Sequence, residues 1–228
     1  MSNLGVPVPP GFTIATTECA RYYDNNKSLA DDLLAQVDQN LAKVEEMMGQ
    51  KFGDPADPLL FSVRSGARVS MPGMMDTILN LGLNDTVVEG LAEKTGNARF
   101  SWDSYRRFVH MFATVVMDLD HHAFEKMIQA KKDAKGVALD TDLSAQDLKE
   151  LTQEYKNYVA SQGQQFPEEP KEQLLLAIGA VFKSWNADRA IKYRNINRIP
   201  HDWGTAVNVQ SMVFGNMGKD CSTGVVFT

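Results

Sequence analysis

The chain runs Leu59-Leu60-Phe61-Ser62-Val63 and then Arg64-Ser65-Gly66-Ala67-Arg68, so an apolar run passes directly into two arginines. Turn-forming prolines precede the run, and a short apolar segment bounded in this way predicts a buried strand. Before it, apolar side chains recur at helical spacing from Leu29 to Met48, and Gly49 follows, which predicts a helix that ends there. A helix followed by a buried strand favours an α/β unit.

The segment from Ser62 to Thr77 has the composition of an anion-binding loop. It contains Arg64, Arg68, several hydroxyl side chains and glycines. Arginine offers paired donors to phosphate oxygens, and glycine lets the backbone approach an anion closely. A surface loop with two solvated arginines is the alternative, since the Gly-x4-Gly-Lys-Ser/Thr pattern is missing. We expect the methionines at 71, 74 and 75 to be exposed on a mobile flap over a ligand.

Helical periodicity dominates from residue 84 to about residue 197. One strong apolar stripe extends from Trp102 to Leu119, and Ser101 is predicted to cap its N-terminus. Ser144 and Asp147 have the spacing of a capping box at the start of a later helix. Polar loops are expected at 133–142 and 162–169.

Strand signals return near the end of the sequence. Residues 206–214 predict one strand, 215–224 a loop, and Val225-Val226-Phe227 the start of a second strand. Within the loop, the segment from Gly215 to Asp220 fits either a phosphate-binding turn or a plain hairpin connection. The sequence stops inside the second strand without a polar tail, so we expect the chain to be a fragment of a longer protein.

The histidines do not predict a metal or catalytic site. His121 and His122 lie near aspartates, but adjacent side chains on a helix point in different directions, and the His-Glu-x-x-His spacing is missing. We therefore predict no metal site in this chain. His110 is predicted to be a packed or surface residue, and His201 lacks the Gly-x-Ser-x-Gly nucleophile motif that a catalytic triad would need.

Composition excludes several classes of function. The chain has 228 residues, with 23 basic and 29 acidic side chains and a formal charge of −6, which argues against a nucleic-acid partner. No apolar run has the length of a membrane span, and the beginning of the chain has no signal-peptide pattern, so no membrane partner is expected. Cys19 and Cys221 are far apart, which favours a reducing, cytoplasmic setting.

Three segments resemble the pyruvate phosphate dikinase family: Pro9-Pro10-Gly11-Phe12, the run from Ser62 to Asp85, and the run from Ala206 to Thr228. The middle run is long and specific, and the resemblance extends over nearly the whole chain. The sequence after Val63-Arg64-Ser65 differs from that of phosphoenolpyruvate synthase, a related kinase. The resemblance implies an α+β (α/β) fold, namely an ATP-grasp-type nucleotide-binding domain with a large helical insertion, truncated at both ends.

Three parts of the chain are expected on this basis. Residues 1–83 would form an α/β subdomain with a phosphate-contacting loop, and residues 84–169 a helical insertion. Residues 170–228 would contain a return helix and the start of the ATP-grasp lobe.

The resemblance also implies a reaction and a set of binding residues. The family converts ATP, phosphate and pyruvate to AMP, pyrophosphate and phosphoenolpyruvate, using Mg²⁺ and a phosphohistidine on a separate swivelling domain. By motif position, Arg64 corresponds to the arginine that binds the ATP phosphates. No catalytic residue is expected in this chain, because the phosphohistidine lies elsewhere. The other implied nucleotide-binding residues are Ser65, Arg68 and Thr77 on the loop, and Gln210, Met212 and Val213 near the adenine.

Some expected parts of the family's site are missing from the sequence. A Gly-Gly-Lys-Gly segment should precede Gly5, and the magnesium ligands should follow Thr228. The resemblance therefore implies that this chain alone lacks a complete active site and is inactive. The implied partners are ATP, phosphate, the phosphohistidine domain and, for the full-length protein, a second copy in a homodimer. Two alternatives are a stand-alone regulatory or scaffold protein derived from this domain, and a kinase similar to phosphoenolpyruvate synthase.

Overall fold

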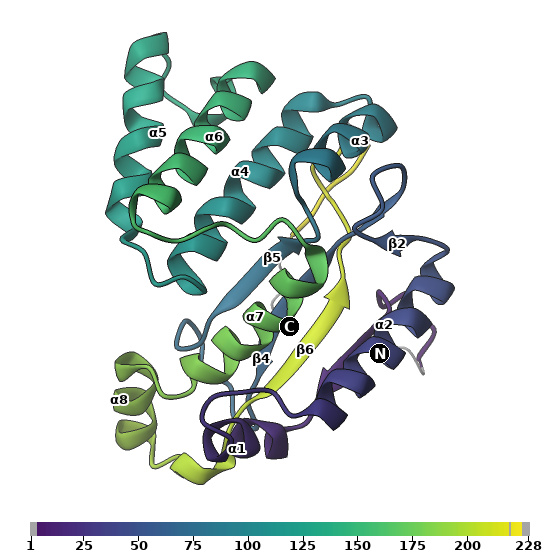
Figure 1. Ribbon diagram of the computed structural model, residues 1–228, viewed down its shortest axis with the longest axis vertical. Coiled ribbons are helices and arrows are strands. Elements are labelled where there is room, and N and C mark those ends of the chain that lie inside the picture. The colour runs from purple at the N-terminus through teal and green to yellow at the C-terminus, as the bar shows by residue number, and fades with distance from the viewer. Residues whose placement is uncertain (1–3, 219, 225–228) are drawn as a thin grey trace.

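A four-stranded antiparallel sheet joins segments that are far apart in the sequence (Figure 1). The structure is a computed structural model that describes residues 4–218 and 220–224. The order of the strands across the sheet is β1 (Gly11–Ile14), β6 (Ala206–Ser211), β4 (Phe61–Gly66) and β5 (Thr77–Leu81). Because β6 lies between β1 and β4, a strand near residue 210 completes a sheet that begins within the first 66 residues.

Alternation along the strands places one apolar face of the sheet against helix α7 (Pro170–Ser184). On β6, Val207 and Val209 are fully buried, whereas Asn208 and Gln210 are half-buried. On β4, Phe61 and Val63 are also fully buried, and α7 contacts β4, β5 and β6. The predicted buried strand is therefore confirmed. Its first residue, Leu59, belongs instead to a separate short strand, β3 (Pro58–Leu59), which pairs in parallel with β2 (Lys51–Phe52).

Helices from the first 48 residues and from the segment after residue 170 lie beside the sheet (Figure 1). α1 (Thr16–Asp24) packs near β6, and α2 (Asp31–Met48) packs near β1. The predicted helix at 29–48 is confirmed as α2, and Gly49 ends it in the left-handed conformation with φ 64°. α8 (Asp188–Asn197) follows α7 and leads to β6 through a short 3-10 turn at His201–Trp203.

The remaining helices form a group at one end of the sheet (Figure 1). This group comprises α3 (Asp85–Thr95), α4 (Ala98–Val115), α5 (His121–Lys135) and α6 (Ala145–Ser161). α4 is its centre, since it contacts α3, α5, α6 and β5. The predominantly helical content predicted for this stretch is confirmed, whereas the division into three parts at 83/84 and 169/170 stays a prediction. None of the described helices has the length and apolar composition needed to cross a bilayer.

Two predictions about helix ends are wrong. The cap of α4 is Asn97, not Ser101, because the Asn97 side-chain oxygen accepts a hydrogen bond of 3.0 Å from the Phe100 N–H. Ser101 is buried inside the helix. The polar loop expected from residue 133 begins later, since α5 continues to Lys135 and ends at Gly136 with φ 67°.

The predicted strand at 206–214 is also shorter in the structure. β6 ends at Ser211, although the Met212 N–H still donates to the Leu60 carbonyl at 2.8 Å. The sequence beyond this point contains Gly215 and two further glycines and does not continue the pairing among the described residues. The second strand expected at 225–227, and Lys219 within the preceding loop, lie outside the described residues.

The capping box at the start of α6 is confirmed. Ser144 Oγ accepts a 3.2 Å hydrogen bond from the Asp147 N–H, and Asp147 Oδ2 accepts one of 3.0 Å from the Ser144 N–H. The other carboxylate oxygen of Asp147 lies 2.6 Å from Lys135 Nζ. The Lys135 ammonium and the Ser144 donors lower the pKa of Asp147 to about 2. This carboxylate therefore links the end of α5 to the start of α6.

We expect Asp147→Asn to lower the free energy of unfolding by about 1 kcal/mol at neutral pH, as loss of a cap and an ion pair does. The unfolded carboxyl binds its proton near pH 3.8, but the folded one does so only near pH 2. The stabilisation is thus fully present above about pH 4 and is lost as the pH falls toward 2. Urea unfolding at several pH values measures it, with Asp24→Asn at the exposed end of α1 as the control. A cost that does not change with pH would contradict this assignment.

Candidate functional site

A row of polar side chains crosses the whole four-stranded sheet. Thr13 on β1 lies opposite Asn208 on β6, Asn208 lies opposite Arg64 on β4, and Arg64 lies opposite Thr77 on β5. Side chains directly opposite in antiparallel strands project from the same face. Thr13 Oγ1 donates a 2.7 Å hydrogen bond to Asn208 Oδ1, which fixes the orientation of that amide. One face of the sheet therefore presents hydroxyl, amide and guanidinium groups in line.

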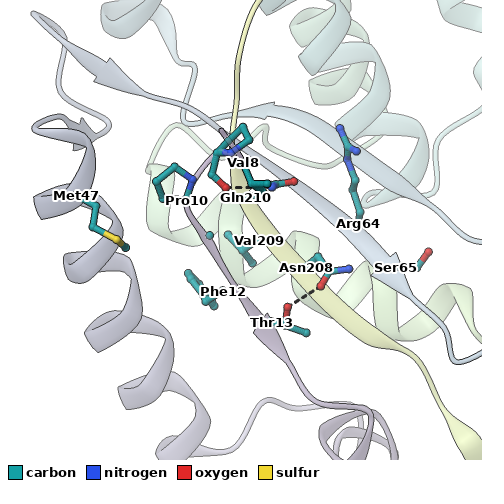
Figure 2. Close-up of a pocket in the computed structure, with 12 residues that line it drawn as sticks. Val8, Pro10, Phe12, Thr13, Met47, Arg64, Ser65, Asn208, Val209 and Gln210 are labelled. Atoms are coloured by element: carbon teal, nitrogen blue, oxygen red, sulfur yellow. Dashed lines mark hydrogen bonds between the residues drawn. The ribbon is translucent and has the colours of Figure 1, made fainter. Parts of the chain in front are cut away.

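Part of this row borders a hollow of about 560 Å³ (Figure 2). Gln210 forms one side of it, and its Nε2 donates a 3.1 Å hydrogen bond to the Pro9 carbonyl. Pro10 is held next to it, because its carbonyl accepts hydrogen bonds of 2.9 Å from both the N–H and the hydroxyl of Ser211. These bonds attach the proline-rich segment to β6 as a wall of the hollow. The lining residues are Val8, Pro9, Pro10, Gly11, Phe12, Thr13, Met47, Arg64, Ser65, Asn208, Val209 and Gln210.

Among the described residues that line this hollow, Arg64 has the one charged side chain. It is exposed, although the residues immediately before it on β4 are buried, so the strand core anchors its backbone. Figure 2 shows its guanidinium extending away from β4. None of the hydrogen bonds or ion pairs found among residues 4–218 and 220–224 uses this guanidinium. Its donors are thus available to an anionic ligand, for which the fork of an arginine is well suited.

The structure brings some of the predicted site residues together and separates others. Arg64, Ser65 and Gln210 border the same hollow, and Thr77 is the cross-strand neighbour of Arg64. Arg68 lies on the following loop, where its guanidinium carbon is 4.9 Å from the centre of the Trp203 ring.

Two further predicted residues, Met212 and Val213, border a different hollow. This second hollow has a volume of about 410 Å³, and Asn80 and Arg107 are also among its lining residues. Met212 and Val213 follow Gln210 by only two and three residues. The chain therefore passes from the first hollow to the second just where β6 ends. Nothing in the geometry places them beside Arg64.

Thr13 and Asn208 were not identified as site residues from the sequence. Asn208 had a readable signal, because the order Val207-Asn208-Val209-Gln210 alternates apolar and polar side chains. With a period of two, Asn208 must share a face with Gln210, which was already a candidate. Thr13 has no comparable signal, since its position depends on the pairing of β1 with β6.

The expected exposure of the loop methionines is wrong. Met71 is buried, and Met74 and Met75 are half-buried and pack against the core. Arg189 of α8 donates a 3.1 Å hydrogen bond to the Met74 carbonyl and also pairs with Asp76. Methionine is flexible enough to fill such irregular gaps, so these side chains hold the loop onto the protein. The mobility of this segment stays a prediction.

His110 is a packed residue, which is one of the two alternatives (packed or surface) that the sequence left open. Its ring stacks on Phe124 with centroids 5.0 Å apart, and its Nε2 lies 2.9 Å from Nδ1 of His121. Burial, reinforced by His121, lowers the pKa of His110 to about 4. The His121 and His122 rings lie edge to face, with centroids 6.1 Å apart and 62° between their planes.

Comparison with known proteins identifies the relatives of this chain. Residues 27–228 match the family model described as pyruvate phosphate dikinase, AMP/ATP-binding domain. The chain is 57% identical over 230 residues to pyruvate, phosphate dikinase of Clostridium symbiosum, and 58% identical over 229 residues to pyruvate, phosphate dikinase 2 of Zea mays. Identity to the chloroplastic pyruvate, phosphate dikinase of Mesembryanthemum crystallinum is 56% over 229 residues. These alignments cover 100% of this chain and 24% to 26% of the relatives, so the chain spans about a quarter of their length.

Proposed function

The chain belongs to the pyruvate phosphate dikinase AMP/ATP-binding domain family, and on this premise we propose that the hollow beside Arg64 binds the phosphates of the nucleotide. The observation that carries the proposal is the Arg64 guanidinium at the end of a buried strand, which has no hydrogen-bond or ion-pair partner among residues 4–218 and 220–224. A hollow of about 560 Å³ is within the range of small-molecule sites. Ser65 follows Arg64 on β4 and also lines the hollow, and Asn208 and Gln210 add amide groups.

The remaining predicted residues would make further contacts with the nucleotide. Thr77, as the neighbour of Arg64 in the sheet, would support the phosphate end, and Arg68 would join it from the adjoining loop. Met212 and Val213 would contact the adenine, beyond Gln210 at the end of β6. These placements follow the family resemblance.

Phosphoryl transfer depends on aligning the phosphates and neutralising their charge more than on covalent help from the protein. Arg64 can supply part of that charge. Mg²⁺ prefers carboxylate and other hard oxygen ligands. The described residues that line this hollow include no carboxylate to bind it. The residues of this hollow do not fit the ion by themselves, and the proposal assigns no step to it here. Its ligands would come from other segments of a longer protein.

The reaction of a protein with the relatives' full length is a wider proposal. In such a protein, ATP bound beside Arg64 would phosphorylate a histidine on a separate domain, and phosphate and pyruvate would be the other substrates. The resemblance also leads us to propose Mg²⁺ as the cofactor, a homodimeric assembly and a cytoplasmic setting. Several relatives carry the word chloroplastic in their names, so the compartment depends on the host.

The Arg64→Met variant tests the phosphate site. We expect it to weaken binding of ATP and AMP by about 10- to 100-fold, since hydrogen bonds to a charged group contribute about 1.5–3 kcal/mol. Arg64→Lys should recover only part of the affinity, because an ammonium cannot form the paired contacts of a guanidinium. Titration calorimetry, or NMR titration where affinity is low, gives the dissociation constants.

Arg107→Met is the comparison variant, since Arg107 is an exposed arginine that borders the second hollow, where the adenine would lie. We expect nucleotide affinity to fall much less than in Arg64→Met, because adenine carries no charge with which this guanidinium could pair. A loss in Arg107→Met together with normal binding by Arg64→Met would move the phosphates to the second hollow and contradict the proposal. Equal nucleotide affinity in the parent, Arg64→Met and Arg107→Met would also contradict it, as would no binding to the parent chain.

A further inference from the structure

A second group of ligand-type side chains lies on the helical part of the protein, outside the nucleotide site proposed above. His121 and Glu125 are four residues apart on α5 and therefore share one face of that helix. His110 on α4 faces them across the helix pair. All three border a hollow of about 320 Å³, so an ion and a water molecule have room beside them. The candidate ligands thus converge from two helices on one space.

The distances within this group are close to those that one metal ion requires. His110 Nε2 and His121 Nδ1 are 2.9 Å apart, and Glu125 Oε1 is 3.7 Å from the other ring nitrogen of His121, Nε2. One ligand atom from each residue can be chosen so that all three lie within 4.8 Å of one another. Two nitrogen ligands of a tetrahedral Zn²⁺ at about 2.0–2.1 Å lie roughly 3.3 Å apart. Small rotations of side chains would therefore open a place for the ion.

The side chains that must move are the exposed ones. His121 has 61% of its side chain exposed and Glu125 has 55%, whereas His110 has only 13% exposed. The His110 ring is held by stacking on Phe124 and by the edge of Tyr155, whose ring centre is 5.8 Å away. One ligand is thus preorganised and two can adjust, which favours binding without rearrangement of the helices.

The positive charges near this hollow are paired with carboxylates. Arg106 borders the same hollow, but its guanidinium lies 2.8 Å from Asp103 and 3.8 Å from Asp140. Lys132 also pairs with Asp140, at 3.0 Å. Arg107 is mostly exposed and lies 4.0 Å from Asp103. These three cations share two carboxylates, Asp103 and Asp140, and Glu125 on the border of the hollow supplies the third negative charge. The formal charges around the hollow therefore sum to zero before an ion binds.

We propose that His110, His121 and Glu125 bind one divalent transition-metal ion, of the class that includes Zn²⁺, between α4 and α5. Two imidazoles and a carboxylate form a ligand set that Zn²⁺ and neighbouring metals prefer over Mg²⁺. Three protein ligands leave a fourth position for water from the open hollow. The ion would replace the direct contact between the two imidazoles and attach α5 to α4.

Titration of the tag-free chain with ZnCl₂ tests this site, in a Cys221→Ser background that removes the exposed thiol. We expect one saturable site and a rise in Tm of about 5 °C or more once the free metal exceeds the dissociation constant about 100-fold. His121→Ala and Glu125→Ala should each weaken binding at least about tenfold. Both side chains are mostly exposed, so these variants should fold normally.

His122→Ala is the matched control, because His122 adjoins His121 at the same end of α5 but neither lines this hollow nor belongs to the group of converging ligand atoms. Its Zn²⁺ affinity should be unchanged. Co²⁺ provides a second readout, since a tetrahedral site gives intense visible absorption that His121→Ala should lose and His122→Ala should keep. Equal Zn²⁺ affinity in His121→Ala and the parent would overturn the proposal. So would the lack of a saturable site, or displacement of Zn²⁺ by an equal concentration of Mg²⁺.

Discussion

Alanine at position 90 will destabilise the protein strongly, although alanine normally stabilises a helix relative to glycine. Gly90 lies inside α3, and a Cβ added there would fall on the backbone carbonyl oxygen of Pro55. The backbone of the Pro55 segment cannot turn aside as a flexible side chain would. We expect the free energy of unfolding to fall by about 3 kcal/mol or more, at the severe end for overpacking. For a chain of this length, Tm should fall by roughly 6–12 °C.

Gly179→Ala provides the matched control for this prediction. Gly179 also lies inside a helix, α7, but its added Cβ would have Tyr22 Oη as its nearest neighbour at 3.4 Å. Alanine there should be neutral or stabilising by up to about 1 kcal/mol, as the helix propensities of the two residues imply. Thermal and urea unfolding of the two variants give the comparison. If Gly90→Ala is as stable as Gly179→Ala, the close approach of Pro55 to α3 is not present in solution.

The contrast between these glycines shows where sequence reasoning succeeds and where it ends. The buried strand, the helix at 31–48 and the capping box at Ser144 depend on residues that are near one another in the sequence, and their patterns predicted them. The role of Gly90 depends on a segment 35 residues earlier. No local pattern contains that contact, because the pairing of α3 with Pro55 arises only from tertiary packing.

The same distinction applies to the two candidate sites. Arg64 and Gln210 were predicted from the family resemblance, but the hollow that both border depends on β6 lying between β1 and β4. Strand order of this kind does not follow from the alternation of side chains. His110 and His121 are 11 residues apart with a turn between two helices, so the sequence placed them on separate elements. Only the packing of α5 on α4 brings their rings together.

Gln173 is a second residue whose importance depends on contacts distant in the sequence. It lies on α7 and is fully buried. Its Oε1 accepts a 3.0 Å hydrogen bond from the Gly82 N–H, and its Nε2 donates to the carbonyls of Leu83 at 3.0 Å and Pro167 at 2.9 Å. Residues 82–84 lead from β5 into the helical group, and residues 162–169 lead back to α7. One side chain therefore holds both connections between the helical group and the sheet that carries Arg64.

We expect Gln173→Met to lower the free energy of unfolding by about 3–5 kcal/mol. Methionine keeps the length of the side chain but leaves three buried backbone groups without partners, at about 1–3 kcal/mol each before relaxation. The Gly82 amide should also lose protection from hydrogen exchange, which separates loss of this bond from a general loss of stability. Gln153→Met on the exposed face of α6 is the control and should change stability by less than about 0.5 kcal/mol. A cost below about 1 kcal/mol for Gln173→Met, with Gly82 still protected, would show that other groups hold the two connections together.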